Sequence, residues 1–128
     1  MTYLAYMRIS TAEERGLQKF SRQEAALKKY AEKNGIEFDK VFKDDASGKN
    51  FNRPEWQKLV NKLNEYKAGN VTIVFKDISR FTRDADNGYA KYMELLDSGV
   101  TLIFLDNPMV STPSTVVLYP RLFSNWKS

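Results

Sequence analysis

The sequence predicts one α/β domain with a mostly parallel central sheet of four to five strands flanked by helices. Three observations predict this class. Short apolar runs alternate along the chain with stretches in which apolar residues recur at helical spacing. The 128 residues are enough for one hydrophobic core and too few for two. No repeat, low-complexity tract or internal linker interrupts the pattern.

The first strand is expected at residues 3–9, where apolar side chains dominate. A polar run that begins at Ser10 ends the strand. Because side chains alternate along a strand, Tyr6, Arg8 and Ser10 should face one side of the sheet. An arginine and a serine on the same face are unusual if that face is only core.

A helix is expected to begin near Ser21, because Ser21 and Glu24 have the spacing of a capping box and Phe20 could pack onto Ala25. Its inward face should carry residues at helical spacing, namely Gln23, Leu27, Tyr30, Ala31 and Asn34. Gly35 supplies the stop.

The second strand is expected at residues 36–42, followed by a polar segment at 43–53 that should form a mobile surface loop. Pro54 suits the first position of a helix, which is expected to end at Gly69. The apolar stripe of this helix consists of Trp56, Leu59, Val60 and Leu63.

Residues 71–75 form the most apolar run in the first 75 residues and are expected to be a central parallel strand. A charged turn at 77–84 should follow, and then a third helix from about residue 85 to Gly99. A further strand is expected at 100–105, before the strand-breaking pair Asn107-Pro108.

The chain lacks cysteine and histidine and has a formal net charge of +4. These absences exclude disulfides, thiolate or histidine metal sites, a Ser-His-Asp triad and the usual neutral-pH proton shuttle. The charge permits a polyanionic partner without demanding one. No apolar run approaches membrane-spanning length, and Arg8 falls where a signal peptide would stay apolar. We therefore expect a cytoplasmic protein with no membrane partner.

Polar residues gather where the predicted strands end. In open α/β sheets, sites form at the carboxyl ends of the strands, and Ser10 lies at the first such end. Arginines from separate segments are expected to join it, namely Arg8, Arg53, Arg80 and Arg83. Since Arg80 and Arg83 are three residues apart, one helical turn would bring both guanidiniums to a common face. Gln23 could point into the same crevice.

A serine among several arginines suggests phosphate chemistry. Guanidinium stays charged and offers a fork of donors that matches phosphate oxygens. A cluster of such groups can stabilise a pentacoordinate phosphorus without a metal. A serine hydroxyl is a weak nucleophile unless it is activated. Without histidine, activation would come from an arginine, a carboxylate or the substrate phosphate, and an Arg or Asp would have to protonate the leaving 3′-oxygen.

Four sequence blocks, in order, resemble the resolvase/invertase family of serine recombinases. They are Tyr6-Met7-Arg8-Ile9-Ser10-Thr11, Gln23-Glu24-Ala25-Ala26-Leu27, Asp44 with Ser47-Gly48 and Arg53-Pro54, and Ser79-Arg80-Phe81-Thr82-Arg83-Asp84. The resemblance covers residues 1 to about 112. Each block alone is a weak signal, whereas their order and spacing are specific.

The resemblance implies a resolvase-like catalytic domain that cleaves and rejoins double-stranded DNA in site-specific recombination. Ser10 would attack the phosphate, form a 5′-phosphoserine bond and free a 3′-hydroxyl. The scissile phosphate would be bound and polarised by Arg8, Arg80 and Arg83, with Arg53 beside them. The supporting residues would be Tyr6, Gln23, Asp44 and Ser47. The family uses neither metal nor nucleotide and works as dimers and tetramers, so we expect no cofactor and a homo-oligomer for the full-length protein.

Two departures from the family pattern refine this expectation, and the first lies within the matching blocks and the loop between them. Ser79 stands where many small resolvases have an aspartate, and the loop between Ser10 and Gln23 is long. Both features favour the large serine recombinases and transposases. If an acid is needed beside the arginines, Asp77 or Asp84 would have to serve.

The second departure concerns the end of the chain. In the family, a long helix follows this domain, drives subunit association and leads to the DNA-binding region, but Pro120 breaks any helix here. We expect residues 1–112 to be the catalytic domain and 113–128 to be a tail, in which 116–119 could add an edge strand. Alone, the chain should not complete recombination.

Three other functions compete with this interpretation. A receiver-like phosphoacceptor domain could use Asp44 or Asp45, but it would need acidic residues to hold magnesium where Arg8 lies. A magnesium-dependent nuclease or topoisomerase-type fold would need clustered carboxylates at strand ends, and the carboxylates of this sequence are too dispersed. A non-catalytic recombinase remnant that regulates or dimerises with an intact recombinase would keep every motif, and it stays open.

Overall fold

The structure, a computed structural model, describes residues 1–10 and 20–111 of the chain. They form a four-stranded sheet in the order β2-β1-β3-β4, in which every neighbouring pair of strands is parallel. The strands are β1 (Thr2–Ile9), β2 (Phe38–Asp45), β3 (Val71–Phe75) and β4 (Val100–Phe104). The predicted parallel α/β architecture is therefore confirmed.

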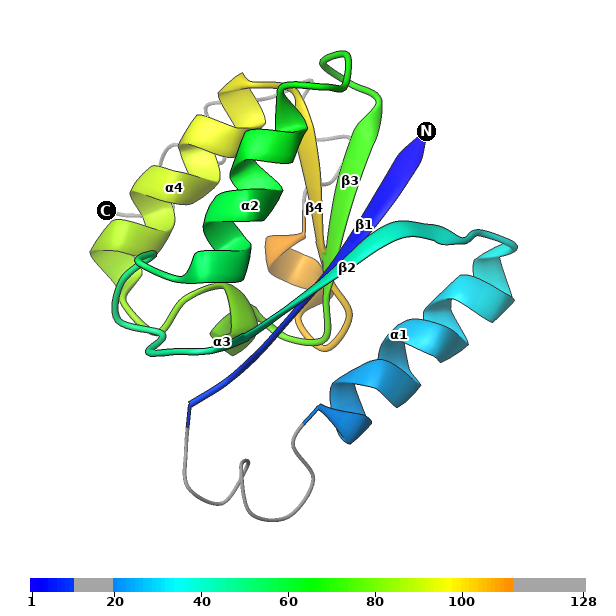
Figure 1. The fold of residues 1–128 in the computed structure, drawn as a ribbon, viewed down its shortest axis with the longest axis horizontal. Helices are drawn as coiled ribbons and strands as arrows, with labels where there is room; N and C mark the ends of the chain where they lie inside the picture. The colour runs from blue at the N-terminus through cyan, green and yellow to red at the C-terminus, as the bar shows by residue number, and fades with distance from the viewer. Residues whose placement is uncertain (11–19, 112–128) are drawn as a thin grey trace.

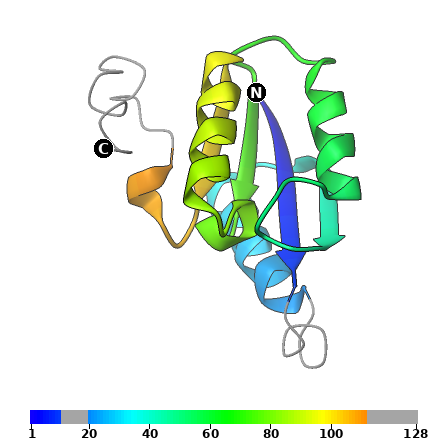
Figure 2. The same ribbon diagram turned by 90° about the vertical axis from the view of Figure 1, so that its left-hand side faces the viewer.

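Helices cover both faces of this sheet (Figure 1). α1 (Ser21–Asn34) lies on one face, whereas α2 (Pro54–Leu63) and α4 (Ala85–Asp97) lie on the other. The turned view places α2 over β2 and α4 over β4 (Figure 2). A single-turn helix, α3 (Ile78–Phe81), follows β3, and a 3-10 turn, η2 (Pro108–Val110), follows β4.

The two faces of β1 belong to two different cores, as the alternation of side chains along a strand requires. Tyr6 lies in the larger core with Trp56 of α2. Met7 lies in the smaller core with Leu27 of α1. Arg8 is the next residue on the face of Tyr6, and it is fully buried. β1 therefore places the buried Arg8 side chain next to the larger core, near the carboxyl end of the sheet.

β2 forms the edge of the sheet and differs from its predicted range, since it begins at Phe38 rather than at residue 36 and runs to Asp45 rather than ending at residue 42. Its last residues pair with the end of β1, where Arg8 lies opposite Asp44. An edge strand can keep polar side chains in solvent, so its polar composition concealed the strand. The predicted surface loop at 43–53 is thus wrong at both ends. Residues 43–45 belong to β2, and Arg53 at the other end is fully buried.

Two helix boundaries also differ from the prediction. α1 begins at Ser21 with Phe20 at the N-cap position and no side-chain hydrogen bond from that residue, so the predicted capping box is wrong. Phe20 packs against the smaller core instead. α1 does end as predicted, with Gly35 in the left-handed conformation at φ 62°. α2 ends at Leu63, well before Gly69, because the chain after it continues in short-range turns.

The possible edge strand at 116–119 lies outside the described residues. Across residues 1–10 and 20–111, no helix has the length and apolar character needed to cross a membrane.

Candidate active site

Ser10 directly follows β1 at the carboxyl end of the sheet and is half-buried. The backbone before it is held from two sides. The Arg8 N–H donates to Gln23 Oε1 at 3.1 Å, and the Arg8 carbonyl accepts from Gln23 Nε2 at 3.0 Å. The Ala46 N–H donates to the Ile9 carbonyl at 3.0 Å. The path of the chain into Ser10 is therefore fixed by a buried side chain of α1 and by the segment after β2.

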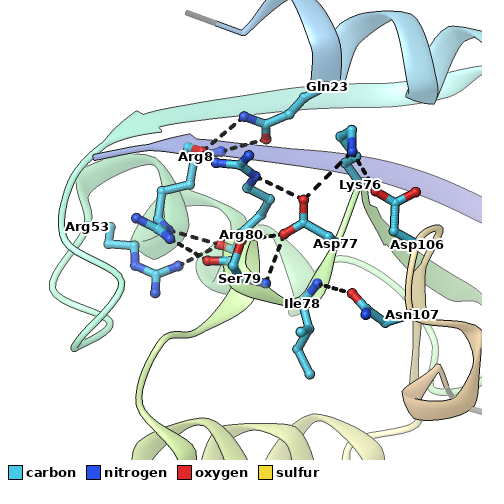
Figure 3. A network of polar contacts seen from close by, with 10 residues as sticks. All are labelled: Arg8, Gln23, Arg53, Lys76, Asp77, Ile78, Ser79, Arg80, Asp106 and Asn107. Carbon is cyan, nitrogen blue, oxygen red and sulfur yellow. Dashed lines mark hydrogen bonds and ion pairs between the residues drawn. The ribbon is translucent and has the colours of Figure 1, made fainter. Parts of the chain in front are cut away.

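The helix α3 brings a second polar segment to the same place. It has only four residues, and Arg80 is one of them. The Nη1 atom of Arg80 donates to the Arg8 carbonyl at 3.0 Å (Figure 3). The same carbonyl also accepts from Gln23, so α1 and α3 meet on the backbone two positions before Ser10.

Two buried guanidiniums cap the carboxyl end of α3. The last carbonyls of a helix have no partner within the helix. Arg8 donates to the carbonyl of Arg80 at 3.3 Å and to that of Ser79. Arg53 donates to the carbonyls of Arg80 at 3.2 Å and of Phe81 at 2.7 Å. Both side chains are fully buried, so Arg8 and Arg53 hold this turn instead of facing solvent (Figure 3).

The remaining bonds of these two guanidiniums also go to the main chain. Arg8 donates to the Ala46 carbonyl at 2.9 Å, and Arg53 to the Asn50 carbonyl at 3.0 Å. In the part of the chain that the structure describes, no carboxylate forms an ion pair with either group. Burial, followed by the positive charges of Arg53 and Arg83, lowers the pKa of Arg8 to about 10. The cluster thus holds positive charge that a bound anion would compensate.

Arg80 and Arg83 are the more accessible arginines, and they are not aligned as predicted. Arg80 is partly buried, and its Nε donates to Asp77 Oδ2 at 3.3 Å. Arg83 is exposed. The helix ends before Thr82, which is extended at φ −154° and ψ 150°. The expectation that one helical turn carries both guanidiniums is therefore wrong.

The backbone at Gly48 lies close to the side chains of both Arg8 and Arg83. The Arg83 N–H donates to the Gly48 carbonyl at 2.7 Å. A Cβ at Gly48 would lie 2.7 Å from Nη2 of Arg8 and 2.8 Å from Cγ of Arg83, so the position has no room for a side chain. The predicted supporting residue Ser47 is exposed, and its Oγ accepts from the Lys49 N–H at 3.1 Å. The sequence marked Ser47-Gly48 as a pair, but the glycine is the member that contacts the arginines.

Asp44 and Tyr6 act on the start of α2. The buried Asp44 accepts from the N–H groups of Glu55 at 3.0 Å and Trp56 at 2.9 Å, and from the Tyr6 hydroxyl at 2.7 Å. Burial, together with the hydrogen bond to Asp44, raises the pKa of Tyr6. The N-cap residue of α2 is Arg53. Asp44 therefore fixes the helix start that presents Arg53 to α3.

Of the two acids predicted beside the arginines, only Asp77 contacts them in the described structure. Asp77 accepts from the Ser79 N–H at 3.0 Å and from Arg80, as given above. Asp84 instead accepts from the Asn87 N–H at 3.3 Å and caps α4.

A pocket of about 450 Å³ opens between α3 and the first turn of α4, with Phe81, Arg83 and Tyr89 in its wall. The exposed Arg83 thus borders a space in which part of a ligand could lie. Within residues 1–10 and 20–111, no group of three or more acidic side chains is placed to hold a metal ion.

A family model described as the N-terminal domain of resolvases matches residues 3–121. The N-terminal catalytic domain of TP901-1 integrase has a TM-score of 0.82 at 21% identity, covering 99% of this chain and 94% of that one. A resolvase family site-specific recombinase from Streptococcus pneumoniae has a TM-score of 0.74 at 18% identity, with 99% and 86% covered.

The C-terminal catalytic domain of ISC1926 TnpA, an IS607-like serine recombinase, has a TM-score of 0.68 at 23% identity, with 82% of this chain and 69% of that one covered. No curated protein matches the sequence. At these identities the structural similarities establish the fold, and the family model establishes the family.

Proposed function

The chain belongs to the resolvase N-terminal domain family, and on that premise we propose that it cleaves and rejoins DNA strands with Ser10 as the nucleophile. The observation that supports this most is the bond from Arg80 to the Arg8 carbonyl, because it joins two separate sequence blocks next to Ser10. The substrate is double-stranded DNA, and the full-length protein works as a homo-oligomer.

The chemistry that suits these residues is a phosphoryl transfer in two mirrored steps. The Ser10 oxygen attacks the scissile phosphorus and loses its proton, while the bond between phosphorus and the 3′-oxygen breaks. The 3′-oxygen leaves with a proton, and the DNA 5′-phosphate is held by serine. A 3′-hydroxyl then attacks this phosphoserine, restores the phosphodiester and returns the proton to Ser10. Because one ester replaces another at each step, no external energy source is needed.

The arginines divide into two groups in this mechanism. Arg83 is exposed and Arg80 is partly buried, so these two would contact the phosphate oxygens. Arg8 and Arg53 are fully buried, so they would not contact the phosphate. Their positive charge would stabilise the developing negative charge from their place against the carbonyls of α3. Asp77 would orient Arg80, with which it already shares a hydrogen bond.

We place the catalytic domain in residues 1–112. The partly buried Val110 packs against the larger core. Ser111 Oγ accepts from the Phe104 N–H at 2.8 Å and so fastens the end of this segment to β4. A chain that ends after residue 112 would keep these contacts.

The test is a search for the covalent intermediate. The domain, fused to a DNA-binding module, is incubated with a suicide DNA substrate in EDTA, and protein–DNA adducts are resolved on a denaturing gel. We expect an adduct that Ser10→Ala abolishes. Ser98→Ala is the matched control, because Ser98 is the C-cap residue of α4 and its Oγ donates to the Glu94 carbonyl of that helix. An adduct that persists in Ser10→Ala, or that requires magnesium, would overturn the proposal.

A further inference from the structure

The helix α3 is too short to hold its own position. It comprises four residues, and the first turn of a helix costs more conformational entropy than its single hydrogen bond repays. Its place must therefore be set by contacts with neighbouring elements. The arginines Arg8 and Arg53 hold the carboxyl end, as described above. The amino end is held by residues that follow β3 and β4 (Figure 3).

We infer that Asn107, which the proposed mechanism does not use, is a positioning residue for Arg80. Asn107 Oδ1 accepts from the N–H of Ile78, the first residue of α3, at 2.9 Å. An N–H at the start of a helix has no partner within the helix, so this bond satisfies a group that would otherwise need water. The inference rests on the proposed function, since it concerns the arginine assigned to the phosphate.

The segment that carries Asn107 is itself well anchored. The Asn107 N–H donates to the Phe104 carbonyl at 3.1 Å, and the Asn107 carbonyl accepts from the Val110 N–H at 3.1 Å. Beyond this turn, Ser111 Oγ bonds to the backbone of Phe104. Asn107 therefore offers its side-chain oxygen to Ile78 from a fixed frame at the end of β4.

A second contact runs parallel to the first. The Asp106 N–H donates to the Lys76 carbonyl at 2.8 Å, which continues the pairing of β3 and β4 beyond the strands. The Lys76 ammonium forms an ion pair with Asp106 and lies 4.0 Å from Asp77 Oδ2. Asp77 in turn accepts from Arg80 Nε. The end of β4 thus supports both the backbone of α3 and the carboxylate that orients Arg80.

Loss of the Asn107 acceptor should loosen this turn without unfolding the domain. Phe81, the last residue of α3, is almost fully buried in the larger core and would stay in place. The end that loosens would be the amino end at Ile78, and the change would reach Arg80 through the backbone of this single turn. Arg80 would then hold the Arg8 carbonyl less firmly, and the phosphate-binding group would be displaced relative to Ser10.

The experiment compares Asn107→Leu, which keeps the side-chain size but removes the acceptor, with Asn107→Asp, which keeps an acceptor. Asn34→Leu is the control, because the Asn34 side chain also forms one hydrogen bond to the backbone, in which its Nδ2 donates to the Tyr30 carbonyl at the far end of α1. Amide hydrogen exchange of the full 128-residue chain is measured by NMR at Arg80 and Thr82, whose N–H groups close α3. The Arg80 Nε–H resonance, assigned by its loss in Arg80→Lys, reports on the bond to Asp77.

We expect Asn107→Leu to speed exchange at these two amides at least tenfold beyond any change in global unfolding, and to shift the Arg80 Nε–H resonance. Asn107→Asp should behave like the unaltered chain, and Asn34→Leu should leave α3 unaffected. In the DNA-binding fusion, Asn107→Leu should slow adduct formation about tenfold or more at saturating DNA, with the half-saturating DNA concentration unchanged.

Unchanged exchange and an unchanged Arg80 resonance in Asn107→Leu would overturn the inference. Equal losses of adduct in the Leu and Asp variants would overturn it too, because the acceptor would then be irrelevant. If the unaltered fusion forms no adduct, the proposed function fails, while the exchange and resonance data still decide whether Asn107 places Arg80.

Discussion

At the scale of single residues, an arginine can give the same donors to a phosphate or to peptide carbonyls. Arg8 and Arg53 give theirs to carbonyls, and all of those bonds are buried or partly buried. Arg83 is exposed, and its backbone N–H is what ties it to the neighbouring loop. The arginines of one cluster should therefore differ sharply in their contributions to folding.

Arg53→Ala should lower the free energy of unfolding by about 3 kcal/mol or more, because it leaves the buried Phe81 carbonyl and the partly buried Asn50 carbonyl without a donor. It also removes one donor to the Arg80 carbonyl, which keeps its bond from Arg8. Arg83→Ala should change it by no more than about 0.5 kcal/mol, since the side chain is exposed. Urea denaturation followed by circular dichroism measures both. Equal losses in the two variants would show that burial does not separate their roles.

Tyr6 should link the stability of the domain to alkaline pH. Burial and the bond to Asp44 raise its pKa above the ordinary value of 10.0. A group with a raised pKa stabilises the fold fully below its unfolded pKa, and this contribution disappears as the pH rises through its folded pKa. The unfolding free energy should therefore fall above pH 10 more steeply in the unaltered chain than in Tyr6→Phe.

Absorbance of the phenolate during alkaline titration gives an independent measurement of the same group. In the unaltered chain, Tyr6 should ionise only as the domain unfolds, and Tyr6→Phe should show one tyrosine fewer in this late step. If all tyrosines ionise together below the unfolding transition, the phenol of Tyr6 is not protected as the structure indicates.

The sequence located most of the residues at this site but not their contacts. Ser10 and Arg8 end a predicted strand, and Gln23 lies on the predicted inward face of a helix, so their positions follow from periodicity. The direction of the Arg8 and Arg53 guanidiniums does not, because it depends on carbonyls of a turn that lies far away in sequence. For the same reason the sequence places Gly48 only within a predicted surface loop, although close approach to two arginines leaves no room for a side chain there.

At the scale of elements, the start of α2 links the sheet edge to the arginine cluster. Asp44 lies in β2 and caps α2 through two N–H groups, and Arg53 is the N-cap residue of the same helix. A carboxylate at a helix N-terminus is favourable both as an acceptor and through the helix dipole. The edge strand is thus also the element that orients α2.

Asp44→Ala should lower the unfolding free energy by about 2 kcal/mol or more, because it removes a cap and leaves the buried Tyr6 hydroxyl without its acceptor. Asp44→Asn should lose less, since one side-chain oxygen remains. Thermal and urea unfolding of the two variants gives the comparison. Asp84→Ala serves as the control, because Asp84 caps α4 with a single exposed bond and should cost about 1 kcal/mol. A smaller loss in Asp44→Ala than in Asp84→Ala would contradict this account.

The elements that could be predicted are those whose pattern is set by burial. β1, β3 and β4 are apolar because neighbours cover them, and their predicted ranges agree with the structure to within a residue. β2 includes residues 43–45, whose polar composition is typical of a loop. An edge strand tolerates such residues because it needs backbone partners on one side only. α3 could not be predicted as a helix, since a single turn is stabilised by distant side chains and not by its own sequence.

At the scale of the whole molecule, the formal net charge of +4 matters less than its distribution. The arginine cluster gathers four guanidiniums, and Asp77 is the carboxylate that pairs with one of them among the described residues. Burial, and after it repulsion within the cluster, disfavours the charged state of Arg8. The folded domain therefore carries an electrostatic cost that a bound anion would reduce.

Inorganic phosphate and sulfate should accordingly raise the melting temperature more than chloride does at equal ionic strength. An anion that binds only the folded state stabilises it by about 1.4 kcal/mol at ten times its dissociation constant, which corresponds to a shift of a few degrees. Arg83→Ala should abolish much of the shift, because Arg83 is the most exposed member of the cluster. Lys29→Ala removes an exposed charge on α1 and should leave the shift intact. Equal shifts in Arg83→Ala and Lys29→Ala would mean that anions act through general screening, and the cluster would then have no specific affinity for phosphate.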